Sequence, residues 1–171
     1  MTTTVPNTTT LKPTTTPLQT KPPMPPRPRQ ATATTTATDS GWFRLIDAVK
    51  EAGQYPTRGE AESITRIVLS ALGGQVVGEE RVALAQALPR EAAVVVASQI
   101  PATRRLTAAA FVDSVATRIE GATPATARWD VSSVLSVLPP LLGEDLTNRL
   151  LSELPPGYAL LFGRADLIPP Q

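Results

Sequence analysis

The sequence predicts an all-α fold in which two tandem helical repeats, of three to four helices each, pack as one bundle-like domain after a disordered Thr/Pro-rich tail. The first observation is a pattern that occurs twice, at an offset of 66 residues (134 − 68). The matched segments are Val68-Leu69-Ser70, Leu72 and Leu88-Pro89 in one copy, and Val134-Leu135-Ser136, Leu138 and Leu154-Pro155 in the other. A repeat of this length is typical of folds in which similar supersecondary units pack on one another.

Composition is the second observation. Aromatic residues make up 4% of the 171 residues, whereas 42% are hydrophobic, mostly Ala, Leu and Val. Strand-rich domains depend on aromatic and β-branched residues, so this composition favours an aliphatic, helical core. About 130 residues follow the tail, enough to bury roughly two-thirds of their unfolded surface.

The chain contains no Cys and no His. Disulfides, thiolate metal sites and a Cys nucleophile are therefore excluded, and the commonest general base and zinc ligand are missing. We accordingly expect no catalytic residue, no cofactor and no metal site, and we predict a non-enzymatic protein.

Charge is distributed unevenly along the chain. Residues 1–40 carry four basic residues against one acidic, a net of +3, and the rest carries twelve basic against fourteen acidic, a net of −2. A nucleic-acid surface needs denser clusters of Lys and Arg, so we expect no nucleic-acid partner. No run of about 18 apolar residues and no apolar leader is present, so we expect a cytoplasmic protein without a membrane partner.

Residues 1–38 form the predicted tail. Thr and Pro dominate it, and its few apolar residues bury too little surface to fold. Pro22, Pro25 and Arg27 match the P-x-x-P-x-R pattern by which an extended peptide docks on an aromatic groove. Because any Pro-rich segment produces such matches by chance, two interpretations stay open: the tail is a spacer, or these three residues dock on a partner.

The first repeat covers residues 39–102. Four helices are expected in it, over about 39–53, 57–72, 79–88 and 90–98. Asp39 or Ser40 caps the first, and a capping box of Thr57 and Glu60 begins the second, which Gly73-Gly74 ends. The residues expected in the core are Trp42, Leu45, Ile46, Val49, Ala61, Ile64, Val68, Leu69, Leu72, Val82, Leu84 and Leu88.

The second repeat covers residues 103–171. Helices are expected from Thr107 to Gly121, from Thr123 to the Pro139-Pro140 pair, and over 144–154, followed by a last one. Tyr158 and Phe162 are expected to hold that last helix against the body. The other residues expected in the core are Ala108, Phe111, Val112, Val115, Ile119, Ala127, Val131, Val134, Leu135, Leu138, Leu146, Leu150, Leu151 and Leu154.

Trp129 is the candidate contact residue of the folded body. At 100° per residue it lies nearly opposite the apolar stripe of its helix, where Ser63 stands in the first repeat. A Trp outside the core face either lies half-buried between the repeats or is exposed as an anchor for a partner. Both interpretations stay open.

A few charged residues have a weaker claim to function. Asp47 and Asp113 occupy matched positions, and paired carboxylates are able to hold a cation, but each is expected to be a surface or ion-paired residue. Arg104-Arg105 in the connection between the repeats are expected to be solvated rather than bound to phosphate or an acidic partner.

The repeated order of a capping Thr, V-L-x-x-L, an acidic helix start and L-P, closed by L-P-x-x-Y-x-x-L-F, resembles a bacterial family, domain of unknown function twenty-two sixty-seven. The resemblance covers about residues 42–163 and is most specific in Leu88-Pro89, Leu154-Pro155 and Leu161-Phe162. One departure is Val96, where the first repeat lacks the Phe found at 162. The resemblance implies a paired-repeat helical domain and no catalytic residue.

These features together favour a bacterial protein-interaction adaptor or scaffold module. Its helical body would bind another protein or a second copy of itself, and its Pro-rich arm would tether or dock it to a larger assembly. The alternative is a small helical domain that binds a hydrophobic ligand or lipid in an aliphatic cavity between the repeats.

Overall fold

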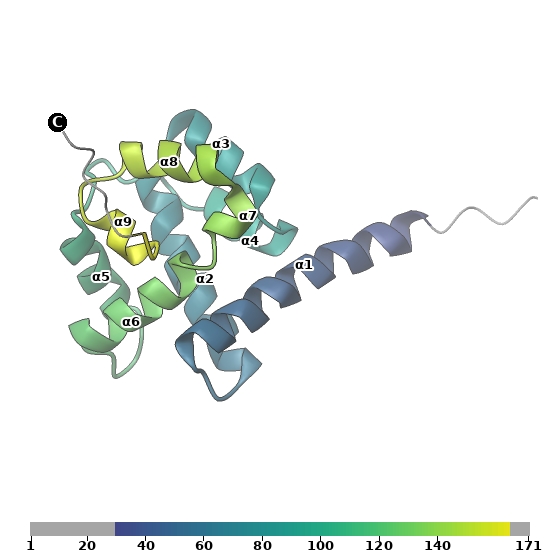
Figure 1. The fold of residues 1–171 in the computed structure, drawn as a ribbon, viewed down its shortest axis with the longest axis horizontal. Helices are drawn as coiled ribbons and strands as arrows, with labels where there is room; N and C mark the ends of the chain where they lie inside the picture. Colours follow the sequence, from purple (N-terminus) through teal and green to yellow (C-terminus); the bar gives the residue numbers. More distant parts are fainter. Residues whose placement is uncertain (1–29, 165–171) are drawn as a thin grey trace, which may run out of the picture.

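The computed structural model describes the backbone of residues 30–164 and the side chains of residues 40–164. Within these residues the chain forms nine α-helices and no strand, which confirms the all-α prediction. The helices are α1 (Gln30–Gly53), α2 (Arg58–Gln75), α3 (Gly78–Ala87), α4 (Arg90–Ala97), α5 (Ala108–Ala116), α6 (Pro124–Leu135), α7 (Pro139–Leu142), α8 (Glu144–Glu153) and α9 (Tyr158–Leu161). In Figure 1 the start of α1 runs outward from a body formed by the other helices.

Helix α1 begins at Gln30, well before the predicted caps at Asp39 and Ser40. The last proline upstream is Pro28, so every later residue of the segment keeps the backbone N–H that a helix needs, and Ala is the strongest helix former. The helix therefore includes residues 30–38, which the sequence assigns to the disordered tail. The rest of that tail lies outside the described residues.

The predicted apolar stripes of α1 and α2 form the core of the first half. All of their members are buried: Trp42, Leu45, Ile46 and Val49 from α1, and Ala61, Ile64, Val68, Leu69 and Leu72 from α2. At the start of α2 the Thr57 hydroxyl accepts a hydrogen bond from the Glu60 amide at 3.2 Å, as predicted. The complete reciprocal box forms at the start of α6 instead, between Thr123 and Thr126.

Helix α2 does not end at Gly73-Gly74 but continues to Gln75. Glycine weakens a helix without blocking it, because its backbone N–H remains. A Cβ added at Gly73 would lie 2.6 Å from the Val96 carbonyl oxygen. Gly73 therefore serves the close approach of α4 to α2 rather than the end of a helix.

The matched helix of the second half is interrupted. Helix α6 ends at Leu135, and Pro139 and Pro140 begin the separate short helix α7. Proline has no N–H to donate and its ring clashes with the preceding turn, so a continuous helix cannot pass through it. The prediction that α6 runs to the proline pair is therefore wrong by one turn.

Several smaller predictions are corrected. Val82 is 57% exposed on α3, because it stands two residues, or about 200°, from the buried Leu84. Helix α5 ends at Ala116 rather than Gly121, with Thr117 at its C-cap and Ile119 only half-buried. Leu151 on α8 and Ala108 on α5, both predicted in the core, are also only half-buried.

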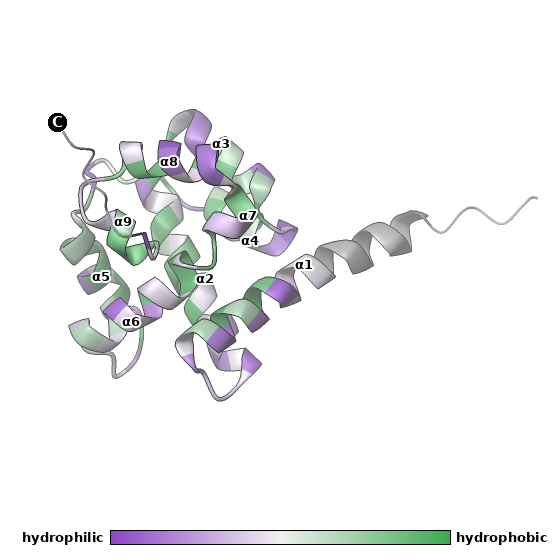
Figure 2. Cartoon of the chain, viewed as in Figure 1, coloured by the Kyte–Doolittle hydropathy of each residue, from purple (hydrophilic) through white to green (hydrophobic). Residues whose placement is uncertain are grey.

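Helix α9 closes the second half, as predicted from its aromatic residues. Tyr158 and Phe162 are both buried, and the Tyr158 ring lies 5.3 Å from that of Phe111. The Tyr158 hydroxyl donates to the Leu106 carbonyl at 3.0 Å. Figure 2 shows hydrophobic residues along α9 and hydrophilic residues on the outer side of α8. None of the described helices combines the length and apolarity that crossing a membrane requires.

Candidate functional site

Trp129 joins the two halves of the body and is exposed at the same time. Its side chain is 55% exposed on α6, while its indole Nε1–H donates to the Gly53 carbonyl at 3.0 Å, at the end of α1. The two sequence-based interpretations are therefore not exclusive. Its role as a contact for a partner stays a prediction.

Asp130, the next residue on α6, makes a second link, to the loop between α1 and α2. The Tyr55 hydroxyl donates to Asp130 Oδ1 at 2.6 Å, and Asp130 is only 9% exposed. Burial, and then the hydrogen bond to Asp130, raise the pKa of Tyr55 well above its ordinary value. The sequence gives no signal for this pair, because 75 residues separate its members and no local pattern connects them.

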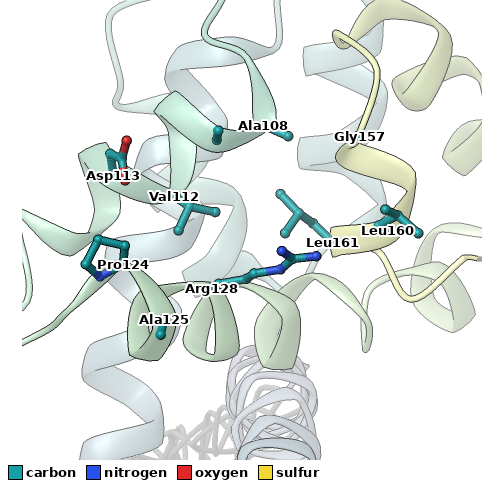
Figure 3. Close-up of a pocket in the computed structure, with 10 residues that line it drawn as sticks. Ala108, Val112, Asp113, Pro124, Ala125, Arg128, Gly157, Leu160 and Leu161 are labelled. Atoms are coloured by element: carbon teal, nitrogen blue, oxygen red, sulfur yellow. The ribbon is translucent and has the colours of Figure 1, made fainter.

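An apolar groove lies between α5, α6 and α9 (Figure 3). Its volume is about 480 Å³. Its lining residues are Ala108, Ala109, Val112, Asp113, Pro124, Ala125, Arg128, Gly157, Leu160 and Leu161. Most of them are aliphatic, and Leu160 is 56% exposed at the margin. We call this the α5–α6–α9 groove.

Small residues leave the α5–α6–α9 groove open. Ala108 and Gly157 both line it and lie so close together that a Cβ added at Gly157 would lie 3.0 Å from the Ala108 Cβ. Sixty-six residues earlier stand Trp42 (108 − 66) and Glu91 (157 − 66). Trp42 is 4% exposed, so the equivalent position of the first half is filled by a large side chain.

Ion pairs also cover Trp42 in the first half. The Arg66 guanidinium lies 4.8 Å from the centre of the Trp42 ring and forms ion pairs with Glu62 at 2.9 Å and Glu91 at 3.3 Å. The residues matched to Glu62 and Arg66 in the second half are Arg128 and Ser132 (62 + 66 and 66 + 66). The second half thus lacks the residues that would build this cover.

Arg128 is the cation of the α5–α6–α9 groove. It makes no ion pair or hydrogen bond with any residue between 40 and 164. In Figure 3 its side chain extends toward Leu160 and Leu161, while Asp113 lies at the other end of the groove. An apolar groove with one guanidinium that has no ion-pair partner among residues 40–164 suits an amphipathic ligand that carries a carboxylate.

The other candidate residues do not gather at one site in the structure. Asp47 forms an ion pair with Arg58 at 2.8 Å, whereas Asp113 lines the groove. No group of three or more possible metal ligands gathers anywhere in the described part of the chain. Arg105, which the sequence predicts to be solvated, instead forms an ion pair with Glu153 at 2.8 Å. Pro22, Pro25 and Arg27 lie outside the described residues.

The matched positions are the signal that would have located the groove from sequence. At the 66-residue offset Ala108 matches Trp42 and Gly157 matches Glu91. At both positions the second half has a much smaller side chain than the first.

A family model described as an uncharacterized conserved protein (DUF2267) matches residues 42–161. No curated protein matches the chain.

Proposed function

Because the chain belongs to the DUF2267 family of uncharacterized conserved proteins, no activity transfers to it, and we propose a function from the groove itself. We propose that the protein is a non-enzymatic adaptor of the bacterial cytoplasm. Its α5–α6–α9 groove binds an amphipathic helix of a partner protein, and its N-terminal arm tethers the complex to a larger assembly.

The single observation behind this proposal is an open apolar groove with an exposed aromatic residue close by on α6. Trp129 stands one helical turn after the groove-lining Ala125, and its side chain is exposed. Trp is enriched among the residues that dominate binding energy, and a helix that presents apolar residues at i, i+3 and i+4 fits a groove of this kind. An acidic residue on that helix would pair with Arg128.

The same groove favours a second candidate, a small amphiphilic ligand. Its volume of about 480 Å³ is within the range of small-molecule sites, about 300–1,000 Å³. A ligand with an apolar chain and a carboxylate would place the chain against Leu160 and Leu161 and the carboxylate against Arg128. This is the hydrophobic-ligand alternative, with the cavity inside the second half rather than between the halves.

The arm has a separate role in the proposal. If Pro22, Pro25 and Arg27 dock on a second protein, the arm raises the local concentration of whatever the groove holds. We expect the substitution of Pro22 and Pro25 by Ala to weaken recruitment to the assembly without changing binding in the groove. Equal recruitment by the variant would make the arm a spacer.

The proposal also includes two tandem repeats, residues 39–102 and 103–171, in one domain. Helix bounds support it: α3 and α8 share both ends at the offset (78 + 66 = 144 and 87 + 66 = 153). Helices α2 and α6 share their starts in the same way (58 + 66 = 124). One copy would then have kept its filled core position while the other opened a binding groove.

Photo-crosslinking in cells tests the adaptor proposal. A photoreactive benzoyl-phenylalanine replaces Leu160 in the full-length chain, and the control carries it at Val94, the matched position (160 − 66), which is 58% exposed. We expect a specific protein adduct from position 160 and not from 94. The adduct should disappear when Ala108→Trp is added, because the indole fills the groove.

Two results would decide against a protein partner. Identical adducts from positions 160 and 94 would mean that the groove has no selectivity. Absence of an adduct, together with a raised melting temperature in decanoate that Ala108→Trp abolishes, would assign the groove to a small amphiphile instead.

A further inference from the structure

A second hollow lies where the two halves join, away from the α5–α6–α9 groove. It is bounded by α2, by α5 and by the connection between α4 and α5, and its volume is about 240 Å³. Arg104 from the connection and Arg118, which follows α5, are its charged lining residues, and the lining contains no Asp or Glu. We call it the basic hollow.

Nothing within the described chain neutralises these two guanidinium groups. Neither Arg104 nor Arg118 forms an ion pair with a residue between 40 and 164. Carboxylate partners are found for Arg58, Arg66, Arg105, Arg149 and Arg164, but not among residues 40–164 for Arg44, Lys50, Arg81, Arg90 and Arg128. What distinguishes Arg104 and Arg118 is that they line the same hollow. The two unneutralised charges therefore stand together in a concave site, where a bound anion would gain from both.

Arg118 is already held in position. Its Nη1 donates to the Ser70 hydroxyl at 3.1 Å, across the junction between α5 and α2. A hydroxyl that accepts one hydrogen bond keeps its own hydrogen for another acceptor, so Ser70 adds a donor beside the guanidinium. A fixed guanidinium loses less side-chain entropy when it binds an anion.

The surrounding backbone is fixed as well. The Ala102 amide donates to the Gly74 carbonyl at 2.7 Å, and the Leu106 amide donates to Gln75 Oε1 at 2.7 Å. These bonds attach the connection to α2 on both sides of Arg104. The hollow is thus built from three segments whose relative positions are set by hydrogen bonds.

From this geometry we propose that the basic hollow binds the phosphate group of a small soluble molecule. The guanidinium fork matches the spacing of phosphate oxygens, and Ser70 supplies a further donor. The volume of the hollow is about 240 Å³. It lies below the range of sites for drug-sized ligands, about 300–1,000 Å³, so the ligand is phosphate itself or a short phosphomonoester.

The position of the site gives this ligand a structural consequence. Ser70 belongs to α2 of the first half, whereas Arg118 belongs to the second half, so a bound phosphate contacts both. Binding to the folded chain alone raises the free energy of unfolding in proportion to the logarithm of the ligand concentration. A phosphate ligand would therefore hold the two halves together.

Titration of the ¹⁵N-labelled full-length chain tests the proposal. Sodium phosphate, glycerol 3-phosphate and sodium chloride are added at equal ionic strength while backbone amide shifts are recorded. We expect both phosphates to produce saturable shifts in residues 70–75, 99–106 and 114–118. Arg118→Ala should weaken binding at least about tenfold, because it removes a charge-assisted hydrogen bond.

The control is Arg90→Ala, which removes an exposed arginine at the start of α4 without an ion-pair partner among the described residues. It should change the affinity less than about twofold. Arg118→Lys keeps the charge but loses the fork, so it gives an intermediate loss even if Arg118→Ala disturbs folding.

The titrations with glycerol 3-phosphate and with inorganic phosphate distinguish the two sources of phosphate. Tighter binding of glycerol 3-phosphate than of inorganic phosphate supports a small phosphomonoester, and equal binding supports the phosphate group alone. The proposal is overturned if chloride produces the same shifts, or if the Arg118 variants bind phosphate as tightly as the parent chain.

Discussion

Trp42 and Ala108 stand 66 residues apart at matched positions in the two halves, but their surroundings differ. Trp42 is buried beneath Arg66, whose two glutamate partners close the surface above it. Ala108 instead leaves room for the α5–α6–α9 groove. The volume of a few side chains therefore decides whether these matched positions form a closed core or an open groove.

A second contrast concerns where the two matched helices, α2 and α6, end. Helix α2 passes through Gly73-Gly74, whereas α6 stops before Pro139. Glycine and proline are both called helix breakers, but only proline removes a backbone donor. In this chain Gly73 admits the backbone of α4, and the proline pair divides the helix.

The largest expected effect compares the cores of the two halves. Phe111→Ala should lower the free energy of unfolding by about 3–5 kcal/mol, since it opens a cavity and removes the ring contact with Tyr158. The matched residue is Leu45 (111 − 66), which is 2% exposed, and Leu45→Ala should cost about 2–4 kcal/mol. Urea unfolding measures both. A larger loss for Leu45→Ala would place the dominant core in the first half.

The next effect tests the role assigned to Gly73. Gly73→Ala should lower the free energy of unfolding by about 1–3 kcal/mol, because its Cβ would strike the Val96 carbonyl oxygen. At Gly74 the nearest atom to an added Cβ is the Ile100 oxygen, at 3.8 Å. Gly74→Ala should therefore be neutral or stabilising by up to about 1 kcal/mol. Similar melting temperatures for both variants would contradict the account.

Alkaline pH should act on the two tyrosines, which are the only ones in the chain. Burial raises the pKa of Tyr158 above its ordinary value, and burial and then Asp130 raise that of Tyr55. A raised pKa means that the folded chain keeps its phenol protons longer than the unfolded chain. Their stabilisation is present below the unfolded pKa of about 10 and is lost as pH rises through it and beyond.

For Tyr158 alone the expected loss is about 1.4 kcal/mol per pH unit above pH 10. Tyrosinate absorbance at 295 nm should therefore appear together with unfolding and not before it. Tyr158→Phe should remove part of this pH dependence. Ionisation of both tyrosines near pH 10 in a chain that stays folded would show that neither phenol is protected.

The smallest effect concerns the link between the halves at Trp129. Trp129→Phe removes the hydrogen bond to the Gly53 carbonyl and should cost about 0.5–1.5 kcal/mol. The matched exposed residue is Ser63, and Ser63→Ala should stay within about 0.5 kcal/mol of the parent. Thermal unfolding compares the two. A loss of several kcal/mol for Trp129→Phe would make that residue part of the core.

Local patterns were enough to predict most helices. Thr57, Thr107 and Thr123 each cap a helix as expected, because a cap depends on residues three positions apart. The apolar stripe of α6 is buried for the same reason, since its period is local. The predicted start of α1 was wrong because the Ala and Thr residues before Asp39, with no proline among them, do not mark a helix boundary.

The groove and the hydrogen bonds around Trp129 could not be predicted from local sequence patterns. The groove needs α5, α6 and α9 to meet, and the Tyr55–Asp130 bond joins residues 75 positions apart. The packing of α9 against α5 also depends on the contact between the rings of Tyr158 and Phe111. Only the offset comparison of Trp42 with Ala108 carried this information in the sequence.

The most direct test of the account is whether the α5–α6–α9 groove binds an apolar anion. The fluorescent dye 8-anilinonaphthalene-1-sulfonate combines aromatic rings with a sulfonate, which suits an apolar groove beside Arg128. Fluorescence titration of the folded chain should give one saturable site, which Ala108→Trp abolishes and Arg128→Ala weakens, while Val94→Ala leaves it unchanged. Dye binding by folded Ala108→Trp that equals binding by the parent chain would contradict the claim that a missing side chain opens this groove.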